Sequence, residues 1–485
     1  MRILFIDFYI ENLGVQALSA FLKQRGHEVS LIQLGNTNLE STVTFSGHSQ
    51  VIDLIRRDRI DIVGFSVFTD AFQATVGLAK RLKTACPGLA VVCGGVHATL
   101  DPESLLDEGC IDYVVVGEGE HALSELLDSL NGGAPSLRSI QNLAYRDQEG
   151  RLVRNGVRPL TQDLDSLPVP DKDLYPEVNK RLYLISTGRG CPRRCLYCVN
   201  SAINMLYAGD RIVRRRSADH VLAELRRAKD SIRRICFMDE MFTSSRVWLK
   251  EFCGRYKAEI GRPFMCQTYP SLLDEEIVAM LKDAGLYTIH FGVQTANESF
   301  RTRVLRRSYS NGELIALADL LHKHSLAFVV DHMLALPFET PKDQEDAIAL
   351  YARMMPTRLL VFFTTVYPNT GLQRLLREHR LINDADVELI RRGQYSSNYF
   401  FGGGLRRADR VRYRYYVRIA IALNLIPIVG RTLAQAMSGT RIFRFFPASM
   451  NLLRLLFIVN YPREWLRYNL MKLMTRSRQP AKVHD

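Results

Sequence analysis

Short, continuous apolar runs alternate with segments of helical period twice along this 485-residue chain, and this repetition restricts its fold more than any other feature. Over residues 1 to about 130 the runs include RILFID, DIVGFSV, AVVCGG and DYVVVG, each followed by an amphipathic stretch. Runs that are apolar at every position are typical of parallel strands covered by helices on both faces. The pattern therefore predicts a Rossmann-like, doubly wound α/β domain over residues 1–135, whose ligands bind beyond the carboxyl ends of its strands.

The second alternation covers residues 181–375 and predicts six further strands, at YLIST, RICFMD, FMCQTY, YTIHFGVQ, AFVVDHMLAL and LLVFFTTVYP. Ser217 is expected to begin one of the intervening helices and Gly285 to end another. Thr340, with Pro341 and Asp343 after it, is expected to begin a third. Six β/α units favour a partial (β/α)6 barrel over a second Rossmann-like sheet. Residues 136–180, with NGGAPS, a hairpin expected around YRDQEGRLV and the segment DSLPVPDKDLYP, are predicted to be a linker.

The composition excludes a disordered chain, because 47% of the residues are apolar and only 24% are charged. The opening segment MRILFIDFYIENLG has one basic residue and no small-residue cleavage site, so it is predicted to be a strand rather than a signal peptide. The nine cysteines are an odd number and three of them cluster, which favours a metal site in a reducing compartment over a disulfide framework. We therefore expect a cytoplasmic protein.

The whole net charge of +13 comes from the C-terminal segment. Residues 405–485 contain 16 basic and 3 acidic residues, a difference of 13, and the rest of the chain is balanced. Arginines interspersed among aliphatic and aromatic residues predict a basic, apolar helical domain over residues 376–485. Its longest nearly uncharged run, residues 419–430, has 12 residues and contains Pro427, so it is too short to span a membrane.

Two interpretations of this C-terminal domain remain open. Its amphipathic helices are suited to an anionic membrane surface, which would make the protein peripheral on the inner face of the membrane. Alternatively, the helices cap the mouth of the barrel, with the arginine stems covering apolar surface. We favour the membrane interpretation. The dense aliphatic content disfavours nucleic acid as a partner.

Three cysteines, Cys191, Cys195 and Cys198, lie within eight residues, directly after the first strand of the second alternation. Three thiolates in one loop suit a soft metal or an iron-sulfur cluster. Three ligands on a four-iron cluster leave one iron free to bind a small molecule and to pass it an electron. A zinc site would need a fourth cysteine or histidine at short spacing, and the sequence has none there.

The C-x-x-x-C-x-aromatic-C loop resembles the signature of radical S-adenosylmethionine (SAM) enzymes. The resemblance implies that the three cysteines hold a [4Fe–4S] cluster, that its open iron binds SAM, and that one electron then generates a 5′-deoxyadenosyl radical. An electron donor such as flavodoxin or ferredoxin is implied as well. Within the cysteine loop, Tyr197 is a candidate SAM-binding residue. Further segments match the family in order and supply the other candidates: Asp239 and Glu240 of FMDEMFT, Gln294 of HFGVQTANE and Pro368 of VYPNTGL. The segment LALPFET departs from the family, because Ala335 and Phe338 replace glycines.

Two loops of the first domain, GGVHATLDPE at residues 94–103 and DYVVVGEGE at residues 112–120, resemble the cobalamin-binding domain of one branch of this superfamily. Glycines there remove side chains where a flat corrin must approach the strand ends. The candidate cobalamin-binding residues are Ser66, Gly94, Gly95, His97, Gly117, Glu118 and Gly119. No histidine lies between Met1 and Gly26, so we expect no histidine ligand on the lower face of the cobalt, with a residue of the segment 9–13 lying near it.

The resemblance implies a cobalamin-dependent radical SAM enzyme, and the reaction we favour is methylation of an unactivated carbon. In that reaction one SAM methylates the cobalt, a second gives the radical that removes a substrate hydrogen, and the carbon radical takes the methyl group. A hydrophobic or amphipathic small molecule, such as an isoprenoid lipid or a tetrapyrrole, is the expected substrate.

Three alternatives remain open. A radical cyclase, oxidase or rearrangement enzyme would use cobalamin without methyl transfer. A methylthiotransferase would be expected to have a second three-cysteine set upstream and a small C-terminal β-barrel, and neither is visible in the sequence. A cobalamin sensor without catalysis would not need the cysteine loop.

Overall fold

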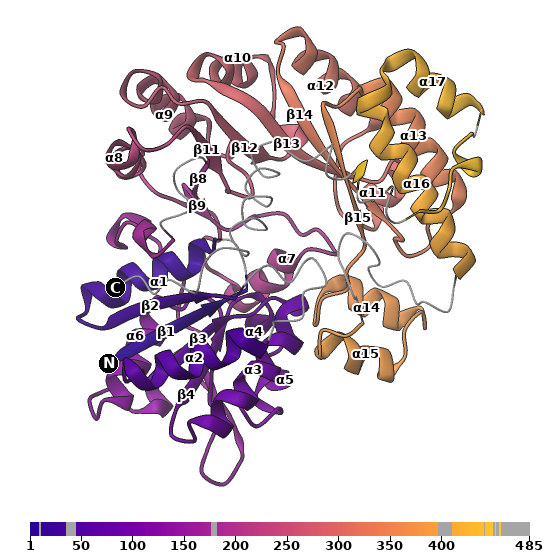
Figure 1. Ribbon diagram of the computed structural model, residues 1–485. Helices are drawn as coiled ribbons and strands as arrows, with labels where there is room; N and C mark the ends of the chain where they lie inside the picture. The colour runs from indigo at the N-terminus through magenta and orange to yellow at the C-terminus, as the bar shows by residue number, and fades with distance from the viewer. Residues whose placement is uncertain are drawn as a thin grey trace.

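The computed structural model describes residues 1–8, 11–34, 45–175, 182–395, 410–440, 442–449, 452 and 455–456. These residues form two large open sheets, each with its own helices. In Figure 1 the first domain lies below the arch that the second sheet forms, and the last helices lie to one side.

The first sheet has seven strands in the order β2-β1-β3-β4-β5-β6-β7. Its strands are β1 (Arg2–Asp7), β2 (Glu28–Gln33), β3 (Ile62–Ser66), β4 (Ala90–Gly94), β5 (Tyr113–Val115), β6 (Leu143–Arg146) and β7 (Leu152–Arg154). The first five pair in parallel. Its helices are α1 (Leu13–Gln24), α2 (Phe45–Arg57), α3 (Phe72–Ala85), α4 (Val96–Leu100), α5 (Pro102–Leu106) and α6 (Glu120–Leu130). Leu4 and Ile6 pack into one apolar cluster and Ile3 and Phe5 into another, which confirms a sheet covered on both faces.

The predicted hairpin around YRDQEGRLV forms, but it is part of the first sheet. β6 pairs antiparallel with β5, and β7 pairs antiparallel with β6. The sheet therefore extends beyond residue 135, the predicted end of the first domain. The hairpin covers the edge that β5 would otherwise expose.

The second sheet has six parallel strands in the order β15-β14-β13-β12-β11-β8. They are β8 (Leu182–Ile185), β11 (Arg234–Phe237), β12 (Phe264–Thr268), β13 (Leu286–Gln294), β14 (Ala327–Leu334) and β15 (Arg358–Phe363). Helices α8 (Ala218–Ala228), α9 (Arg246–Glu259), α10 (Glu275–Ala284), α11 (Glu298–Arg303), α12 (Asn311–Lys323) and α13 (Pro341–Met354) lie between them. Between β8 and α8, the segment that contains the three cysteines has three short elements: β9 (Gly188–Arg189), α7 (Val199–Ile203) and β10 (Arg214–Arg215). β8 and β15 are the two edges of this sheet, so the arrangement is the predicted partial barrel.

The predicted helix ends of the barrel are confirmed. The Ser217 side chain accepts a hydrogen bond from the His220 backbone N–H at the start of α8. Gly285 ends α10 in the left-handed conformation with φ 112°, where a side chain would be strained. Thr340 and Asp343 form the capping box of α13, with Pro341 in its first turn.

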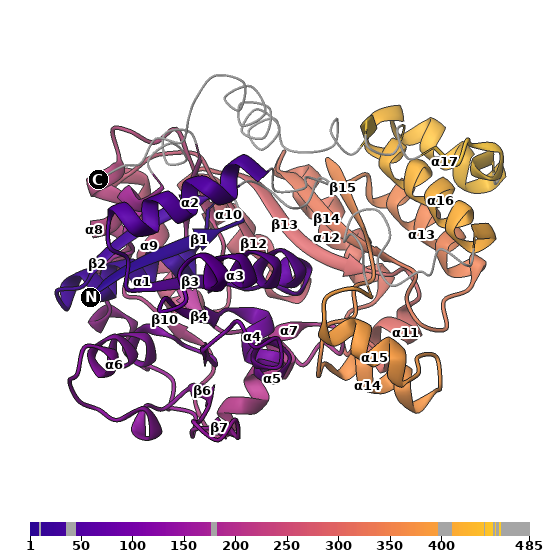
Figure 2. The same ribbon diagram turned by 60° about the horizontal axis from the view of Figure 1, so that its bottom comes forward.

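The C-terminal helices divide into two groups, as Figures 1 and 2 show. α14 (Gly371–Glu378) and α15 (Asp384–Arg391) reach the first domain, where Arg391 pairs with Asp101 at 2.8 Å. α16 (Arg410–Val429) packs on β15 and α13, and α17 (Arg431–Thr440) packs on α13. Ile419 and Leu423 of α16 are buried in the same apolar cluster as the outer face of the barrel strands. α16 and α17 thus extend the outer helical layer. The helices of the described residues include none that is long and apolar enough to cross a membrane.

A buried polar network joins α16 to the loop after β14. His332 hydrogen-bonds to Tyr351 at 3.0 Å and to Gln344 at 3.1 Å, and Gln344 donates to Glu339. Tyr416 of α16 also hydrogen-bonds to Glu339, whose second oxygen accepts from the backbone N–H of residue 335. Burial raises the pKa of Glu339 to about 7 and lowers the pKa of His332 to about 4, so both groups are neutral in weak acid.

Glu339→Gln should remove a component of the pH dependence of stability. Because the folded-state pKa of Glu339 lies above the ordinary value of 4.5, the folded protein holds this proton more tightly than the unfolded chain does. The contribution of Glu339 to the free energy of unfolding therefore falls as the pH rises from about 4.5 to above 7, by up to about 3 kcal/mol. The variant should therefore gain stability relative to wild type at pH 8 but not at pH 4.5. Urea unfolding at the two pH values measures the difference, and an equal change at both, or a change matched by the exposed control Glu251→Gln, would contradict it.

Candidate active site

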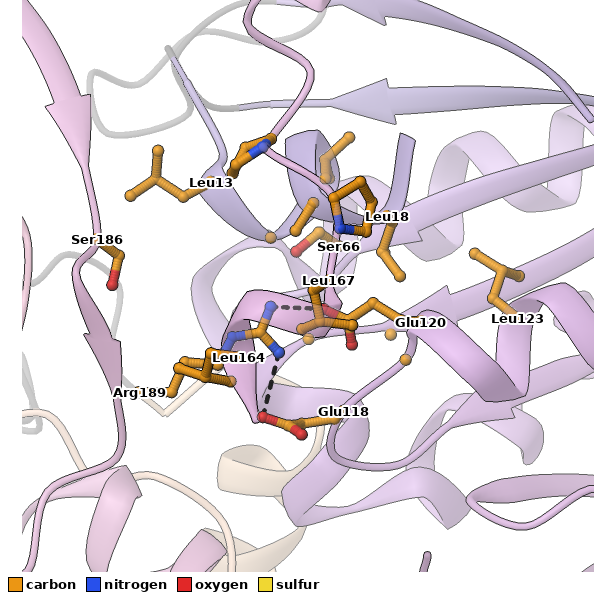
Figure 3. Close-up of a pocket in the computed structure, with 18 of the residues that line it drawn as sticks. Leu13, Leu18, Ser66, Glu118, Glu120, Leu123, Leu164, Leu167, Ser186 and Arg189 are labelled. Atoms are coloured by element: carbon orange, nitrogen blue, oxygen red, sulfur yellow. Dashed lines mark hydrogen bonds and ion pairs between the residues drawn. The ribbon is translucent and has the colours of Figure 1, made fainter. Parts of the chain in front are cut away.

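A pocket of about 420 Å³ lies between the carboxyl ends of the first-sheet strands and the barrel, and Figure 3 shows it. Six predicted residues of the first domain line it: Ser66, Gly94, Gly95, Gly117, Glu118 and Gly119. Ile185, Ser186, Gly188, Arg189, Gly190, Met238 and Glu240 line it from the barrel side. The pocket lies where a doubly wound sheet is expected to bind a ligand.

The glycines of this pocket are needed for different structural reasons. A Cβ atom on Gly94 would meet nothing closer than 3.9 Å and would project into open space. Gly95 has φ 92°, and a Cβ there would lie 2.9 Å from the Val67 nitrogen. Gly117 has φ 78°, and a Cβ there would lie 1.7 Å from the Tyr207 hydroxyl. Gly94 thus keeps the pocket open, whereas Gly95 and Gly117 are required by the fold itself.

His97 is not brought to the pocket. It is fully buried, with its Nδ1 3.0 Å from the Thr69 hydroxyl and its Nε2 3.0 Å from the Ser104 hydroxyl. Burial lowers its pKa to about 4, which keeps the ring neutral. Both ring nitrogens are engaged inside the first domain, so His97 supports the loop rather than facing a ligand.

Glu118 lines the pocket, but its carboxylate is engaged by the barrel. Arg189 donates to Glu118 at 3.1 Å and to Glu120 at 2.6 Å, as the dashed lines in Figure 3 show. Arg214 donates to the same oxygen of Glu118 at 2.8 Å. Burial raises the pKa of Glu120, but Arg189, a backbone hydrogen bond and His121 together lower it more, so the net pKa lies below the ordinary value. This ion-pair network, Glu118, Glu120, Arg189 and Arg214, joins the two domains at the rim of the pocket.

The segment expected near the lower face of cobalt is partly described. Residues 9 and 10 lie outside the described residues. Glu11 accepts hydrogen bonds from Gln16 at 2.9 Å and from Lys172 at 3.3 Å. Leu13 lines the pocket, so an apolar side chain from this segment faces the ligand space.

The cysteine loop follows β8 and β9, directly after the pocket residue Gly190. Cys195 is buried, and Cys191 and Cys198 are half-buried. Among the described residues no set of three His, Cys, Asp or Glu side chains is gathered closely enough for a single metal ion. A four-iron cluster binds its cysteines through separate irons and does not need that closeness. Burial raises the pKa of Cys198 to about 11, so a bound metal would have to stabilise its thiolate.

Arg307 is a residue of this site that the sequence did not reveal. Its guanidinium lies 3.6 Å from the Cys195 sulfur and 3.2 Å from the Tyr197 hydroxyl. It also donates to the Gly292 carbonyl at 2.7 Å and to the Tyr309 hydroxyl at 2.7 Å. Arg307 is 112 positions from Cys195, and it stands in the sequence as one of several arginines, with no local signal to distinguish it. It places a buried positive charge beside the cysteine loop.

The two candidate carboxylates after β11 face different surroundings. Asp239 is buried and accepts hydrogen bonds from the Thr187 backbone at 3.0 Å and the Thr187 hydroxyl at 2.7 Å. Burial raises its pKa although Arg215 and Thr187 lower it. Glu240 instead lines the pocket and accepts from Asn200 at 3.3 Å. Glu240 is therefore the one of the two that is open to a ligand.

The remaining SAM candidates are Gln294, Pro368 and Tyr197, and all three are at least partly buried. Gln294 is buried with φ 72°, and its amide nitrogen would lie 2.1 Å from a Cβ on Gly292. Pro368 is buried in the segment before α14, and that segment meets the cysteine loop where the residue 372 N–H donates to the Leu196 carbonyl at 2.9 Å. Tyr197 packs against two apolar clusters.

Ala335 and Phe338, which replace the expected glycines, keep the backbone conformation that favours glycine. Their φ values are 60° and 61°, in the left-handed region. Such a conformation costs about 1 kcal/mol or more for a residue with a side chain. Phe338 is nevertheless half-exposed and packs edge-on to His379 at 4.8 Å.

Comparison with known proteins agrees with this arrangement. The B12 binding domain model matches residues 3–127, and the Radical SAM superfamily model matches residues 185–351. An uncharacterized methyltransferase of Pyrococcus horikoshii is 28% identical over 369 residues, which are 74% of this chain and 77% of that protein. The hopanoid C-3 methylase of Methylococcus capsulatus is 24% identical over 459 residues, which are 89% of this chain and 82% of that protein.

Among solved structures, the radical SAM methyltransferase TsrM from Kitasatospora setae, with tryptophan and a SAM analogue bound, shares the fold. The TM-score is 0.70 at 17% identity, and the match covers 99% of this chain and all of that one. The expected order of domains is thus confirmed. The chain carries a B12-binding domain followed by a radical SAM domain, and it is homologous to the cobalamin-dependent radical SAM methyltransferases.

Proposed function

We propose that this protein methylates an unactivated carbon of a hydrophobic or amphipathic small molecule, using a [4Fe–4S] cluster, SAM and cobalamin. One juxtaposition carries the proposal: the glycine-lined pocket of the first domain reaches Gly190, the residue directly before Cys191. A corrin in the pocket would therefore lie next to the loop that carries the cluster.

The residues present suit these groups. Cys191, Cys195 and Cys198 would hold the cluster, and Glu240 is positioned to bind SAM at the same rim. Ser66 and Gly94 would lie against the corrin, with Leu13 and no histidine on the described part of the neighbouring segment. When bound, the cluster with SAM supplies a hydrogen-abstracting radical, and cobalamin supplies a methyl group. The side chains named above would hold the cluster, SAM and cobalamin in their places.

The function is tested by anaerobic turnover with SAM that carries an isotopic label in its methyl group. Candidate substrates are isoprenoid lipids and tetrapyrroles, with flavodoxin or ferredoxin as the electron donor. A product that carries the label, together with 5′-deoxyadenosine, supports methyl transfer. A changed but unlabelled product would assign the protein to the cyclase, oxidase or rearrangement class instead.

Gly94→Val should weaken cobalamin binding without unfolding the first domain. A valine side chain there would project into the open pocket, and β-branched residues are well tolerated in strands. We expect at least a tenfold weaker affinity for hydroxocobalamin, measured by absorbance titration, with an unchanged melting temperature of the corrin-free protein. Gly77→Ala on α3 is the matched control, because a Cβ there meets nothing within 4 Å and Gly77 does not line the pocket. Equal affinity of Gly94→Val and wild type would contradict this place for the corrin.

A cytoplasmic location and an association with anionic membranes are further parts of the proposal. All nine cysteines are unpaired, as suits a reducing compartment. α16, α17 and the turn Ile442–Phe445 pack against one another and expose four apolar side chains, Ile428, Leu433, Ile442 and Phe445. Arg414 and Arg431 are exposed on the same two helices. Apolar side chains with basic neighbours are the combination that an anionic lipid surface attracts.

Flotation with vesicles of phosphatidylcholine and phosphatidylglycerol tests the membrane association. Wild type should float at low salt, and the double variant Leu433→Ser/Phe445→Ser should lose most of the floating fraction. Val247→Ser on α9 is the control, since Val247 is the exposed apolar residue of another face at 81% exposure. Absence of wild-type flotation at low salt, or equal flotation of all three proteins, would overturn the proposal.

A further inference from the structure

The inner face of the barrel carries a polar group that the expected cofactor sites do not use. Along β13 the residues Ile289, Phe291 and Val293 pack into the outer apolar cluster beneath the helices. Successive strand residues point to opposite faces, so His290, between them, lies on the inner face. The same alternation on β14 buries Phe328 and Val330 outside and places Asp331 inside.

Three inner-face polar side chains are adjacent. His290 Nε2 lies 2.7 Å from the Asp331 carboxylate, across the pairing of β13 with β14. Gln267 of β12 is the register partner of His290 on the other side. We call Gln267, His290 and Asp331 the inner polar trio. The side chains of His290 and Asp331 are 14% and 22% exposed, so solvent reaches them.

Apolar side chains lie on both sides of the trio on the inner face, and Arg358, the register partner of Val329, begins β15 on the same face. Leu184, Cys236 and Met265 form one inner cluster, and Val329, Leu360 and Phe362 form another. A hydrogen-bonded ion pair in such surroundings contributes little to stability compared with apolar side chains of similar size. Its presence therefore points to a ligand rather than to the fold.

We propose that the inner polar trio binds a hydroxyl or carbonyl group of an otherwise apolar substrate and so positions that substrate in the barrel. This inference rests on the proposed function and narrows its substrate class. Along β13, His290 is four residues before Gln294, which corresponds to about 13 Å at the usual rise of a strand. The polar group would therefore bind deep in the barrel, and the apolar body would extend toward the cysteine loop.

The hydrogen-bonding capacity of the trio suits a neutral polar group. With Nε2 engaged by Asp331, His290 Nδ1 has no hydrogen-bond partner among the described residues, and neither has the Gln267 amide. Together these two groups can donate to and accept from a hydroxyl, or donate to a carbonyl. A carboxylate or phosphate is less suited, because Asp331 lies beside the only imidazole of the trio. Arg234 does not change this conclusion, because it lies nearer the amino ends of the strands, where its guanidinium is stacked on the Tyr287 ring at 4.8 Å.

The test measures binding to the corrin- and cluster-loaded protein, with 1-decanol, decane and decanoate as probes and ligand-observed NMR as readout. We expect wild type to bind 1-decanol about tenfold more tightly than decane, the effect of one hydrogen bond to a charged or strongly polar partner. His290→Phe and Gln267→Leu should each reduce this preference to about twofold or less. Val247→Ser should leave it unchanged.

Each outcome decides the inference. No preference in wild type, an unchanged preference in both variants, or tighter binding of decanoate than of 1-decanol would overturn it. If His290→Phe does not retain iron and corrin, Gln267→Leu alone decides, because leucine matches glutamine closely in size. The readout needs no turnover. A changed but unlabelled product together with an intact decanol preference would therefore disprove methyl transfer and leave the polar site standing.

Discussion

Cys195→Ala should abolish the iron-sulfur cluster and reduce turnover by at least about 10³-fold. Cys195 is the buried member of the three-cysteine loop, and its sulfur lies beside the Arg307 guanidinium. With one of the three proposed ligands removed, the cluster would lose an iron-sulfur bond that no neighbouring cysteine replaces, since the next in sequence, Cys236, is buried on β11. Anaerobic purification with iron and sulfide analysis should find close to background, against about four irons per chain in wild type.

The control for this prediction is Cys86→Ala. Cys86 is half-buried at the end of α3 in the first domain, and it belongs to none of the proposed ligand sets. It should keep wild-type iron content and 5′-deoxyadenosine formation. Hydroxocobalamin binding to Cys195→Ala should be retained, which separates loss of the cluster from misfolding. A Cys195→Ala protein with full iron and activity would instead support a sensor that does not use the loop.

Local patterns in the sequence predict most of the fold. Short apolar runs placed all six barrel strands, and in β13 the residues 289, 291 and 293 that pack under the helices are apolar, whereas residues 290 and 292 between them are not. Caps such as Ser217 and Gly285 act within one helical turn, so their residue types alone place the helix ends. The placement of α16 on β15 could not be predicted in this way, because a basic, apolar helix fits the outside of a barrel, its mouth or a membrane equally well by composition.

The candidate site also contains some features that local sequence patterns predict and others that they do not. The three cysteines are separated by a few residues and could be proposed as ligands from their spacing, and the glycines that follow the strands could be proposed in the same way. Arg307 and Cys195 are 112 positions apart, and Arg189 and Glu118 are 71 positions apart. Contacts of this kind depend on how the two sheets are placed, which no local pattern specifies. For the same reason, the sequence identified Glu118 as a cobalamin candidate but did not reveal that two arginines donate hydrogen bonds to it.

Arg189→Met should destabilise the corrin-free protein by about 3 kcal/mol at neutral pH, which is the usual cost of removing one partner of a buried ion pair. Glu118 would keep Arg214, but Glu120, only 7% exposed, would lose its ion-pair partner. Arg189 holds the pKa of Glu120 below its ordinary value against the effect of burial, so in wild type this carboxylate stabilises the fold above about pH 4.5. Without Arg189, burial is opposed only by the weaker backbone hydrogen bond and His121, so we expect the pKa of Glu120 to rise and the penalty to grow as the pH rises above 4.5.

The loss of stability in Arg189→Met should therefore be largest near pH 8 and should shrink toward pH 4, where Glu120 takes up a proton. Chemical denaturation at several pH values measures this profile. Glu120→Gln added to Arg189→Met should recover much of the loss at pH 8, because an amide carries no charge to leave unpaired, while the same substitution in wild type should destabilise. Arg246→Met, which breaks an exposed pair with Asp274, should change stability little at any pH. A loss that is independent of pH, or one that Glu120→Gln does not relieve, would mean that Arg189 acts through packing and that the ion pairs do not hold the two domains together at the pocket.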